Sequence, residues 1–286
     1  MAWYYWCNHG RLGNLLMQFA AIENMIDTGE VVLCFNDRMF DALHTKGRYV
    51  RLPHLRYLVP NFNHYTNKLF DYLASRSLLS RIVPQTYLYD CGDEHECANL
   101  LRTEGFVKHF TVIKGYFQHD KWLQNAFKFK YDKYDRASAR LMRLSPSRCR
   151  VAVHVRLNDY MEWVVLGKKD VSICRQWYDM AIEHASAVLD NPEFIFFTDD
   201  VDGLKKYGFT MDLRIYGGVD AIEELIAISL CEHAIISPST FAYSAVMSTY
   251  YPDKLVIAPK YWAGYKSGVW FPPTIESSKI HYIEVP

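Results

Sequence analysis

The sequence has no apolar stretch of the roughly 18 residues that a membrane-spanning helix needs. The apolar start, Met1–Cys7, is shorter than that and has no basic leader, so it predicts a first buried strand and not a signal peptide. We therefore expect no transmembrane segment and a cytoplasmic location. An anchor outside this sequence and a peripheral association with a membrane both stay open.

The sequence also lacks an excess of charge of either sign, because 32 Lys and Arg balance 32 Asp and Glu. No long-range field then draws the chain to nucleic acid or to an anionic membrane. We expect no nucleic-acid partner, and an anionic ligand has to be held by local groups.

Common cofactor motifs are missing as well. The seven cysteines form no C-x-x-C pair, which argues against a zinc or thioredoxin-type site; Cys91 and Cys97 could bridge in an oxidising compartment, but free thiols are expected. The turn Gly10–Asn14 is no Walker loop, because no Gly-Lys-Ser/Thr follows, and it lacks the third glycine of a dinucleotide fingerprint. It is either a tight turn that needs positive φ or a close backbone approach to a ligand from the first domain.

What is present is globular composition, with 50% hydrophobic residues, 21 Tyr and 7 Trp, which pack cores or form platforms for sugar rings. The apolar pattern predicts strands alternating with helices, and therefore parallel sheets covered on both faces. Helices and loops are expected between Asp37 and Leu100. Strands are expected at Met1–Cys7, Glu30–Phe35, Thr111–Tyr116, Val151–Val155, Phe194–Phe197, Ile215–Tyr216, Ala234–Ser237 and Leu255–Ala258, and helices at Leu15–Met25, from His119, at Ile173–Leu189, Asp220–Cys231 and Ser239–Tyr250.

The basic segment Tyr131–Arg150 contains Ser145-Pro146-Ser147, where a helix is expected to end and two domains to join. The expected division is an α/β domain at 1–148, which the family resemblance described below implies is the acceptor side, and an α/β domain at 149–286, which it implies binds the nucleotide sugar. In open α/β sheets, ligands bind beyond the carboxyl ends of the strands. Residues directly after each strand are therefore the candidates for function.

The strand Val151–Val155 contains His154 and is followed by Arg156 and Asp159. An arginine here can grip a diphosphate with its planar fork and stabilise charge on a departing nucleoside diphosphate. His154 can donate a hydrogen bond to phosphate or base, and Asp159 can orient the arginine or accept a proton. The alternative is a structural Arg-Asp ion pair at a domain surface.

Thr198-Asp199-Asp200 follows the strand Phe194–Phe197. Paired carboxylates can hold a divalent metal with a diphosphate or cap the next helix. No further ligand cluster lies nearby in the sequence, so the cap is favoured and no metal site is expected.

Ser237-Pro238-Ser239-Thr240-Phe241 follows the strand Ala234–Ser237 and begins a helix. Hydroxyl and backbone N–H groups at a helix start bind anions, although an ordinary Ser/Thr cap is the alternative. Glu224, in the first turn of the preceding helix, either complements the helix dipole or accepts hydrogen bonds from guanine.

Five motifs together resemble the α-1,2-fucosyltransferases of glycosyltransferase family 11. In chain order, they are similar to that family's Gly-Gly-Leu-Gly-Asn-Gln-Met-Phe-Gln-Tyr-Ala, Gly-Tyr-Trp-Gln, His-Val-Arg-Arg-Gly-Asp-Tyr, Phe-Ser-Asp-Asp and Asn-Ser-Ser/Thr-Phe-Ser-Trp-Trp segments. The corresponding residues here are 9–20, 115–118, 154–160, 197–200 and 224–241.

The resemblance implies a GT-B type fold of two Rossmann-like domains, and inverting transfer of L-fucose from GDP-fucose to a glycan hydroxyl, with α-1,2 linkage. It implies no cofactor and no essential metal. Arg156 matches the contact to the diphosphate, Ser239 and Thr240 the phosphate-binding loop, and Glu224 a guanine contact. The set expected to bind the donor is His154, Arg156, Glu224, Ser239, Thr240, Phe241, Gly10, Gly13 and Asn14.

The chain departs from the family pattern at four places: Leu157 replaces the second arginine, Asn158 the glycine, Tyr243-Ser244 the Trp-Trp pair, and Leu15 a glutamine. These changes put the donor sugar and the acceptor in doubt more than the nucleotide. The expected catalytic residues are Arg156, Asp159 as base and Glu162 as the next candidate for base. A transferase using another GDP-sugar, an inactive GDP- or sugar-binding module and a nucleotide-sugar hydrolase remain alternatives.

Overall fold

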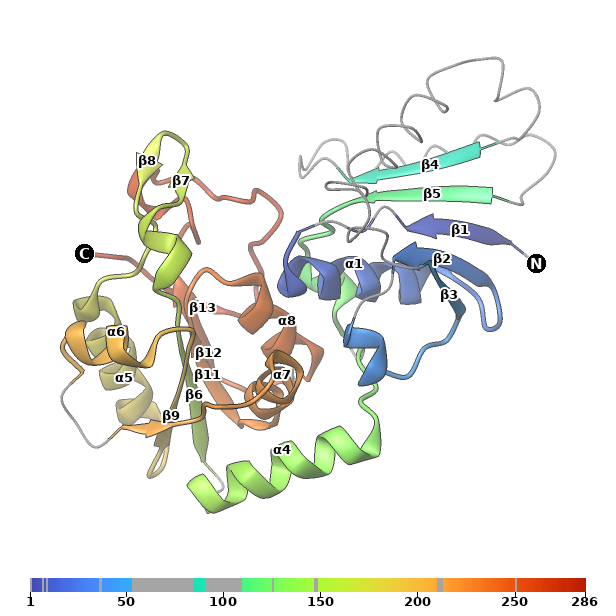
Figure 1. Ribbon diagram of the computed structural model, residues 1–286. Coiled ribbons are helices and arrows are strands. Elements are labelled where there is room, and N and C mark those ends of the chain that lie inside the picture. The colour runs from blue at the N-terminus through green and yellow to red at the C-terminus, as the bar shows by residue number, and fades with distance from the viewer. Residues whose placement is uncertain are drawn as a thin grey trace. The chain divides into compact units, whose positions relative to one another are not determined.

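The structure is a computed structural model that describes residues 2–6, 8, 10–35, 38–52, 85–90, 110–124, 126–146, 149–209, 213–249 and 251–286. Contacts between Cα atoms divide the chain into two compact units, Met1–Phe117 and Gln118–Pro286. Both units are α/β and are built on parallel sheets (Figure 1). The prediction of parallel α/β architecture is confirmed.

The first unit holds a five-stranded sheet in the order β3-β2-β1-β5-β4, in which all neighbours run parallel. The helix α1 follows β1 and buries the apolar face that its sequence spacing predicts. Trp6 of β1 donates its indole N–H to Gln18 Oε1 of α1 at 2.9 Å, so this buried contact joins the strand to the helix. The described elements of this unit are β1 (Trp3–Trp6), α1 (Leu12–Met25), β2 (Val31–Phe35), a 3-10 turn (Arg38–Asp41), β3 (Arg48–Leu52), β4 (Gln85–Asp90) and β5 (Phe110–Gly115).

The second unit holds a six-stranded parallel sheet in the order β10-β9-β6-β11-β12-β13. The described elements of this unit are α4 (Tyr131–Leu144), β6 (Arg150–Val155), β7 (Val164–Val165), β8 (Lys168–Lys169), α5 (Arg175–Val188), β9 (Glu193–Thr198), α6 (Val201–Lys206), β10 (Arg214–Ile215), α7 (Ala221–Leu230), β11 (His233–Ile236), α8 (Thr240–Ser248), β12 (Val256–Pro259) and β13 (His281–Ile283), with 3-10 turns at Asp120–Trp122, Asn158–Met161 and Tyr265–Ser267.

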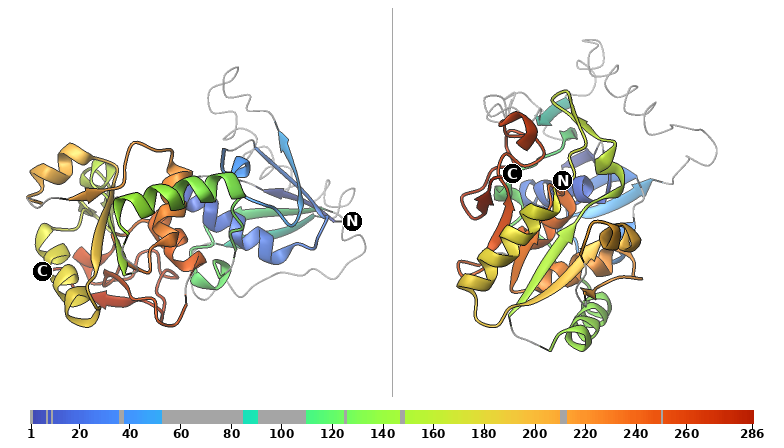
Figure 2. Two further views of the ribbon diagram at one scale, coloured as in Figure 1. Left: turned by 90° about the horizontal axis from the view of Figure 1, so that it is seen from below. Right: turned by 90° about the vertical axis from the view of Figure 1, so that its left-hand side faces the viewer.

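Helices cover both faces of this sheet: α5 and α6 lie on one side, and α7 and α8 on the other (Figure 1). The central strand β6 is buried along nearly its whole length, as expected of a strand covered on both faces. Its alternate residues Val151, Val153 and Val155 pack with Trp177 of α5 and Leu204 of α6. The indole N–H of Trp177 donates to the Ile283 carbonyl at 3.1 Å, and Figure 2 shows the C-terminal end of the chain beside α5.

The division between the units lies before α4, whereas the sequence-based boundary at 148/149 falls inside the second unit. The reason is that α4 packs on α7 of that unit. Lys133 of α4 forms an ion pair with Asp220 at 3.0 Å, and Arg140 lies over the ring of Tyr216. Lys133 and Arg140, which the sequence analysis placed in a connection between domains, therefore hold α4 against the rest of the second unit.

The helix predicted from His119 begins later than expected: Asp120–Trp122 forms a 3-10 turn, and α4 spans Tyr131–Leu144, ending at Ser145 as predicted. The structure also contains strands β3, β4 and β13 and the hairpin β7–β8, which the sequence pattern did not indicate. β3 and β4 fall in the segment read as helices and loops, most of which lies outside the described residues. All three single strands are sheet edges, and β3 carries exposed Arg48 and Arg51 in place of an apolar run.

Within the described part of the chain, no helix combines the length and the hydrophobicity that crossing a bilayer requires.

Cys174 and Cys231 carry free thiols, while Cys7, Cys91 and Cys97 lie outside the described residues.

Candidate active site

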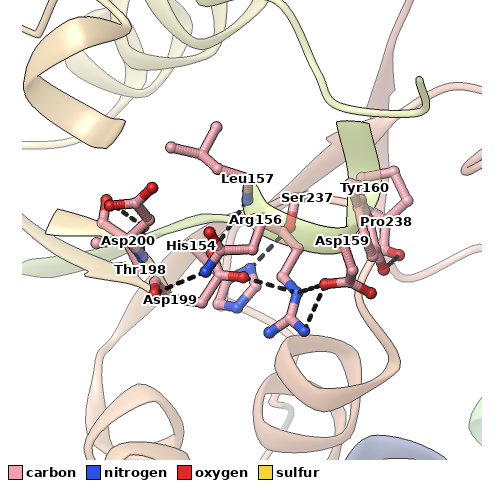
Figure 3. Close-up of polar contacts among 11 residues, drawn as sticks. His154, Arg156, Leu157, Asp159, Tyr160, Thr198, Asp199, Asp200, Ser237 and Pro238 are labelled. Carbon is pink, nitrogen blue, oxygen red and sulfur yellow. Dashed lines mark hydrogen bonds and ion pairs between the residues drawn. The ribbon is translucent and has the colours of Figure 1, made fainter. Parts of the chain in front are cut away.

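Arg156 directly follows β6 and is held from two sides by carboxylates (Figure 3). Its Nε and Nη2 donate to Asp159 Oδ1 at 3.0 and 2.8 Å, and Nε lies 3.2 Å from Asp199 Oδ2. No described residue forms a hydrogen bond with Nη1, and the side chain is 24% exposed. The arginine is thus fixed through one edge of its fork, and its other terminal nitrogen is left to bind an anion.

Leu157, at the position of the family's second arginine, lies in the hydrophobic core. Its side chain is 1% exposed and belongs to the cluster of Val155 and Leu204. In Figure 3 it points away from the Arg156 guanidinium. The site therefore has a single arginine at this strand end, and position 157 serves packing.

Asp199 is a site residue that the sequence reasoning did not assign. Its Oδ1 accepts the Leu157 N–H at 3.0 Å, in addition to the contact of Oδ2 with Arg156. Its neighbour Asp200 behaves as predicted and caps α6, accepting the Gly203 N–H at 2.8 Å. Because β9 pairs with β6 in parallel, the two strand ends coincide, and this adjacency was the signal available in the sequence.

His154 is buried, and its ring faces Ser237 at the neighbouring strand end. Its Nδ1 lies 2.8 Å from Ser237 Oγ, and its carbonyl accepts the Ser237 N–H at 3.2 Å. Burial, and next the charge of Arg156, lower the pKa of His154 to about 3. A neutral imidazole cannot add positive charge for a phosphate, so the geometry favours a role in holding the turn that starts at Ser237.

The N-terminus of α8 differs from those of α6 and α7. The side chains of Asp200 and Asp220 cap α6 and α7, whereas Ser239 at the start of α8 makes no side-chain cap and the first turn contains no acid. Ser239 is buried, and Thr240 and Phe241 form the beginning of the helix. Since β11 pairs with β6 in parallel, the carboxyl ends of both strands lie on the same side of the sheet. The positive N-terminus of α8 therefore lies on the same side as Arg156.

The side-chain carboxyl of Glu224, in the first turn of α7, makes no hydrogen bond or ion pair with any described residue. Burial, with a smaller contribution from the charge of Asp199, raises its pKa to about 7, while Arg156 acts in the opposite direction. These electrostatic contributions place Glu224 near Asp199 and Arg156. A half-buried carboxyl with unoccupied oxygens can accept hydrogen bonds from a ligand.

The remaining predicted residues are Glu162 in the second unit and Gly10, Gly13 and Asn14 in the first. Glu162 is 77% exposed and forms an ion pair with Lys169 at 2.8 Å. Gly10, Gly13 and Asn14 belong to the first unit. Gly10 has φ +90°, where a Cβ would lie 2.8 Å from Asn14 Nδ2, so the turn needs glycine, whereas Gly13 lies inside α1.

Among the described residues, no group of three or more His, Cys, Asp or Glu side chains is arranged to hold a metal ion. The acids of the site point instead to nitrogen donors: Asp159 to Arg156, Asp199 to Arg156 and Leu157, and Asp200 to Gly203.

The chain is similar to solved structures of fucosyltransferases. POFUT1 in complex with GDP is 10% identical, with 90% of this chain and 97% of that chain covered and a TM-score of 0.54. NodZ alpha-1,6-fucosyltransferase soaked with GDP-fucose is 13% identical, with coverages of 86% and 92% and a TM-score of 0.51. At these identities the likeness shows the fold, which is GT-B-like, as the sequence predicted.

A model of glycosyl transferase family 11 matches residues 39–264, so the chain belongs to this family. The match includes Arg156, Asp199 and the start of α8, and it begins after the Gly10–Asn14 turn. The search of curated protein sequences found no match. Membership of the family that the motifs resemble is thereby confirmed.

Proposed function

We propose that the protein transfers L-fucose from GDP-fucose to a hydroxyl of a glycan acceptor, inverting the configuration at C1 and forming an α-1,2 linkage. The observation that carries the proposal is the free edge of the Arg156 fork beside the uncapped N-terminus of α8, in a member of family 11. Structures with the same fold are complexes of POFUT1 with GDP-fucose and of NodZ soaked with GDP-fucose, which supports the donor.

The donor diphosphate lies between Arg156 and the first turn of α8. Ser239, Thr240 and Phe241 supply hydroxyl and backbone N–H donors, and the helix dipole favours the negative charge. As the bond to C1 breaks, charge grows on the leaving diphosphate, and Arg156 stabilises it. His154 supports this arrangement through its two contacts with Ser237.

Glu224 binds the guanine base. Its ionised carboxylate accepts hydrogen bonds from the N1–H and N2–H₂ groups, which only guanine presents together among the common bases. The absence of a protein partner for this half-buried carboxyl and its pKa of about 7 support the role, because an acceptor without donors is costly to ionise.

Deprotonation of the acceptor hydroxyl requires little help in this mechanism. Asp159 is the candidate base, but its Oδ1 already accepts two N–H groups of Arg156. Glu162 is the second candidate and is paired with Lys169. Weak assistance suits an oxocarbenium-like transition state, in which the bond to the leaving group is largely broken.

Gly10, Gly13 and Asn14 are also proposed to bind the donor, as the resemblance of residues 9–20 to the family's first motif implies. We propose a cytoplasmic location, which is compatible with peripheral association with a membrane. The proposed division of roles assigns residues 1–148 to the acceptor and residues 149–286 to the donor.

Incubation with GDP-[¹⁴C]fucose and a panel of β-galactosides, with GDP-mannose as a second donor, tests the proposal. Product analysis by NMR gives the linkage and the anomeric configuration. Arg156→Ala is expected to lower kcat by about 10²- to 10³-fold, as for loss of a donor that stabilises transition-state charge. Arg136→Ala, which removes an exposed arginine of α4, serves as the matched control and should keep full activity.

Near-normal transfer by Arg156→Ala would overturn the assignment of Arg156 to the diphosphate. Release of GDP without any acceptor would instead indicate a nucleotide-sugar hydrolase, and binding of GDP without turnover an inactive module. Transfer from GDP-mannose and not from GDP-fucose would show that this protein, with Leu157 in place of the second arginine, uses a different donor sugar.

A further inference from the structure

Asp199 contacts three consecutive residues of the turn that contains Arg156. Its Oδ2 lies 3.2 Å from Arg156 Nε, and its Oδ1 accepts the Leu157 N–H at 3.0 Å. Its backbone carbonyl accepts the Asn158 amide Nδ2–H at 2.9 Å. One residue at the end of β9 therefore ties down the whole of the turn that follows β6 (Figure 3).

Two of these contacts involve the positions at which the chain departs from the family motif. Leu157 inserts its side chain into the core and presents its N–H to Asp199, and Asn158 supplies an amide that a glycine lacks. Burial of the Leu157 side chain and the contacts with Asp199 thus hold the turn in place.

We propose that Asp199, together with Leu157 and Asn158, is a positioning device that holds Arg156 with its Nη1 edge toward the donor diphosphate. The inference rests on the proposed function for its catalytic consequence. Asp199 touches no reacting atom in this scheme. It acts through Arg156.

Geometry separates this role from simple charge neutralisation. Nε is shared by Asp159 and Asp199, and Nη2 is bound by Asp159, so the two acids fix both the plane and the direction of the guanidinium. A carboxylate near a diphosphate weakens binding by repulsion, so Asp199 has a cost for ground-state affinity. Its benefit must then appear in the orientation of Arg156 during transfer.

The test compares Asp199→Asn with Asp200→Asn, which makes the same change of charge one residue away. Asp199→Asn keeps an amide oxygen for the Leu157 N–H and loses the ion pair. We expect kcat for transfer from GDP-fucose to fall by about 10- to 100-fold, because a misplaced catalytic group costs this much. The Kd for GDP, measured by calorimetry, should stay unchanged or decrease.

Asp200→Asn keeps an amide oxygen that can cap α6, so the melting temperature should stay near native and kcat should stay within about twofold. A purely structural role of Asp199 would lower activity and GDP binding together, in proportion to the loss of folded protein. If Asp199→Asn does not fold, Asn158→Ala removes one of the three contacts from an exposed side chain and should still lower kcat by about threefold.

A readout that needs no donor keeps the two proposals separate. The ¹⁵N resonance of Arg156 Nε–H, assigned by its absence in Arg156→Lys, should broaden or shift in Asp199→Asn and not in Asp200→Asn. That pattern in a protein without fucosyl transfer would leave the positioning role standing and refute the proposed function. Fucosyl transfer with an unchanged kcat in Asp199→Asn would refute the positioning role alone.

Discussion

At the scale of single residues, the site pairs one arginine with an excess of carboxyl groups. Arg156 is flanked by Asp159 and Asp199, and Glu224 lies close enough to be influenced by both Asp199 and Arg156. Acids that surround a cation hold it in place but oppose an anionic ligand. The protonation of Glu224 is therefore the adjustable charge of the site.

The affinity for GDP-fucose is expected to depend on pH through Glu224. Its pKa of about 7 means that the free site carries a proton below that pH, whereas guanine needs the ionised form as acceptor. Affinity should be constant above pH 7 and fall by up to about tenfold for each pH unit below it. Calorimetry between pH 5.5 and 8.5 measures this; GDP-fucose is used because it has no terminal phosphate that titrates in this range.

Glu224→Gln is the control, and it should bind more weakly at pH 8 with a flat pH profile. Its stability gives an independent check of sign. The folded-state pKa is above the ordinary value of 4.5, so the favourable contribution of the native carboxyl exists below pH 4.5 and is lost as the pH rises through 7. The variant should therefore melt higher than the native protein at pH 8. An unaltered pH profile in Glu224→Gln would contradict the guanine assignment.

At the scale of elements, α8 begins differently from α6 and α7. Three helices follow strand ends of the same sheet, and two of them are capped by their own aspartates. The third, α8, begins at buried Ser239 without a side-chain cap. A helix that forgoes a cap gives up stability of about 1 kcal/mol, which a bound phosphate can restore.

Ser239→Asp is expected to change stability and binding in opposite directions. The carboxylate caps α8 and should stabilise the unliganded protein by about 1 kcal/mol, measured by urea unfolding. The same negative charge should weaken GDP binding by at least about tenfold. Ser239→Ala adds no charge and loses no cap bond, so its stability should be nearly native. Equal GDP affinity in Ser239→Asp and the native protein would remove the phosphate from this helix end.

At the scale of the whole molecule, we expect transfer without a divalent metal. Asp159, Asp199 and Asp200 accept nitrogen donors, and in the proposed site Arg156 and α8 supply the positive potential. Activity in 5 mM EDTA should equal activity in 5 mM Mg²⁺ within about twofold, since no step requires the ion. Loss of transfer in EDTA that added Mg²⁺ restores would show that an ion shares the diphosphate.

Much of the second unit could be predicted from the chain alone. β6, β9, β11 and β12 are short apolar runs because both of their faces are buried, and such runs stand out against their surroundings. The edge strands β3 and β13 and the hairpin β7–β8 were missed, since exposed edges tolerate polar and charged residues. The role of α4 was missed for a different reason: its partner α7 begins about 80 residues later, and only folding brings them together.

The sequence by itself determined that Arg156 and Ser239 follow strands of one parallel sheet, because apolar runs and chain direction indicate this; the pairing of those two strands came from the structure. Only the tertiary structure decided where the adjacent side chains point. Leu157 enters the core, His154 turns to Ser237, and Asp199 reaches across to the Arg156 turn. These directions depend on packing and hydrogen bonds between residues more than 40 positions apart, which no local pattern records.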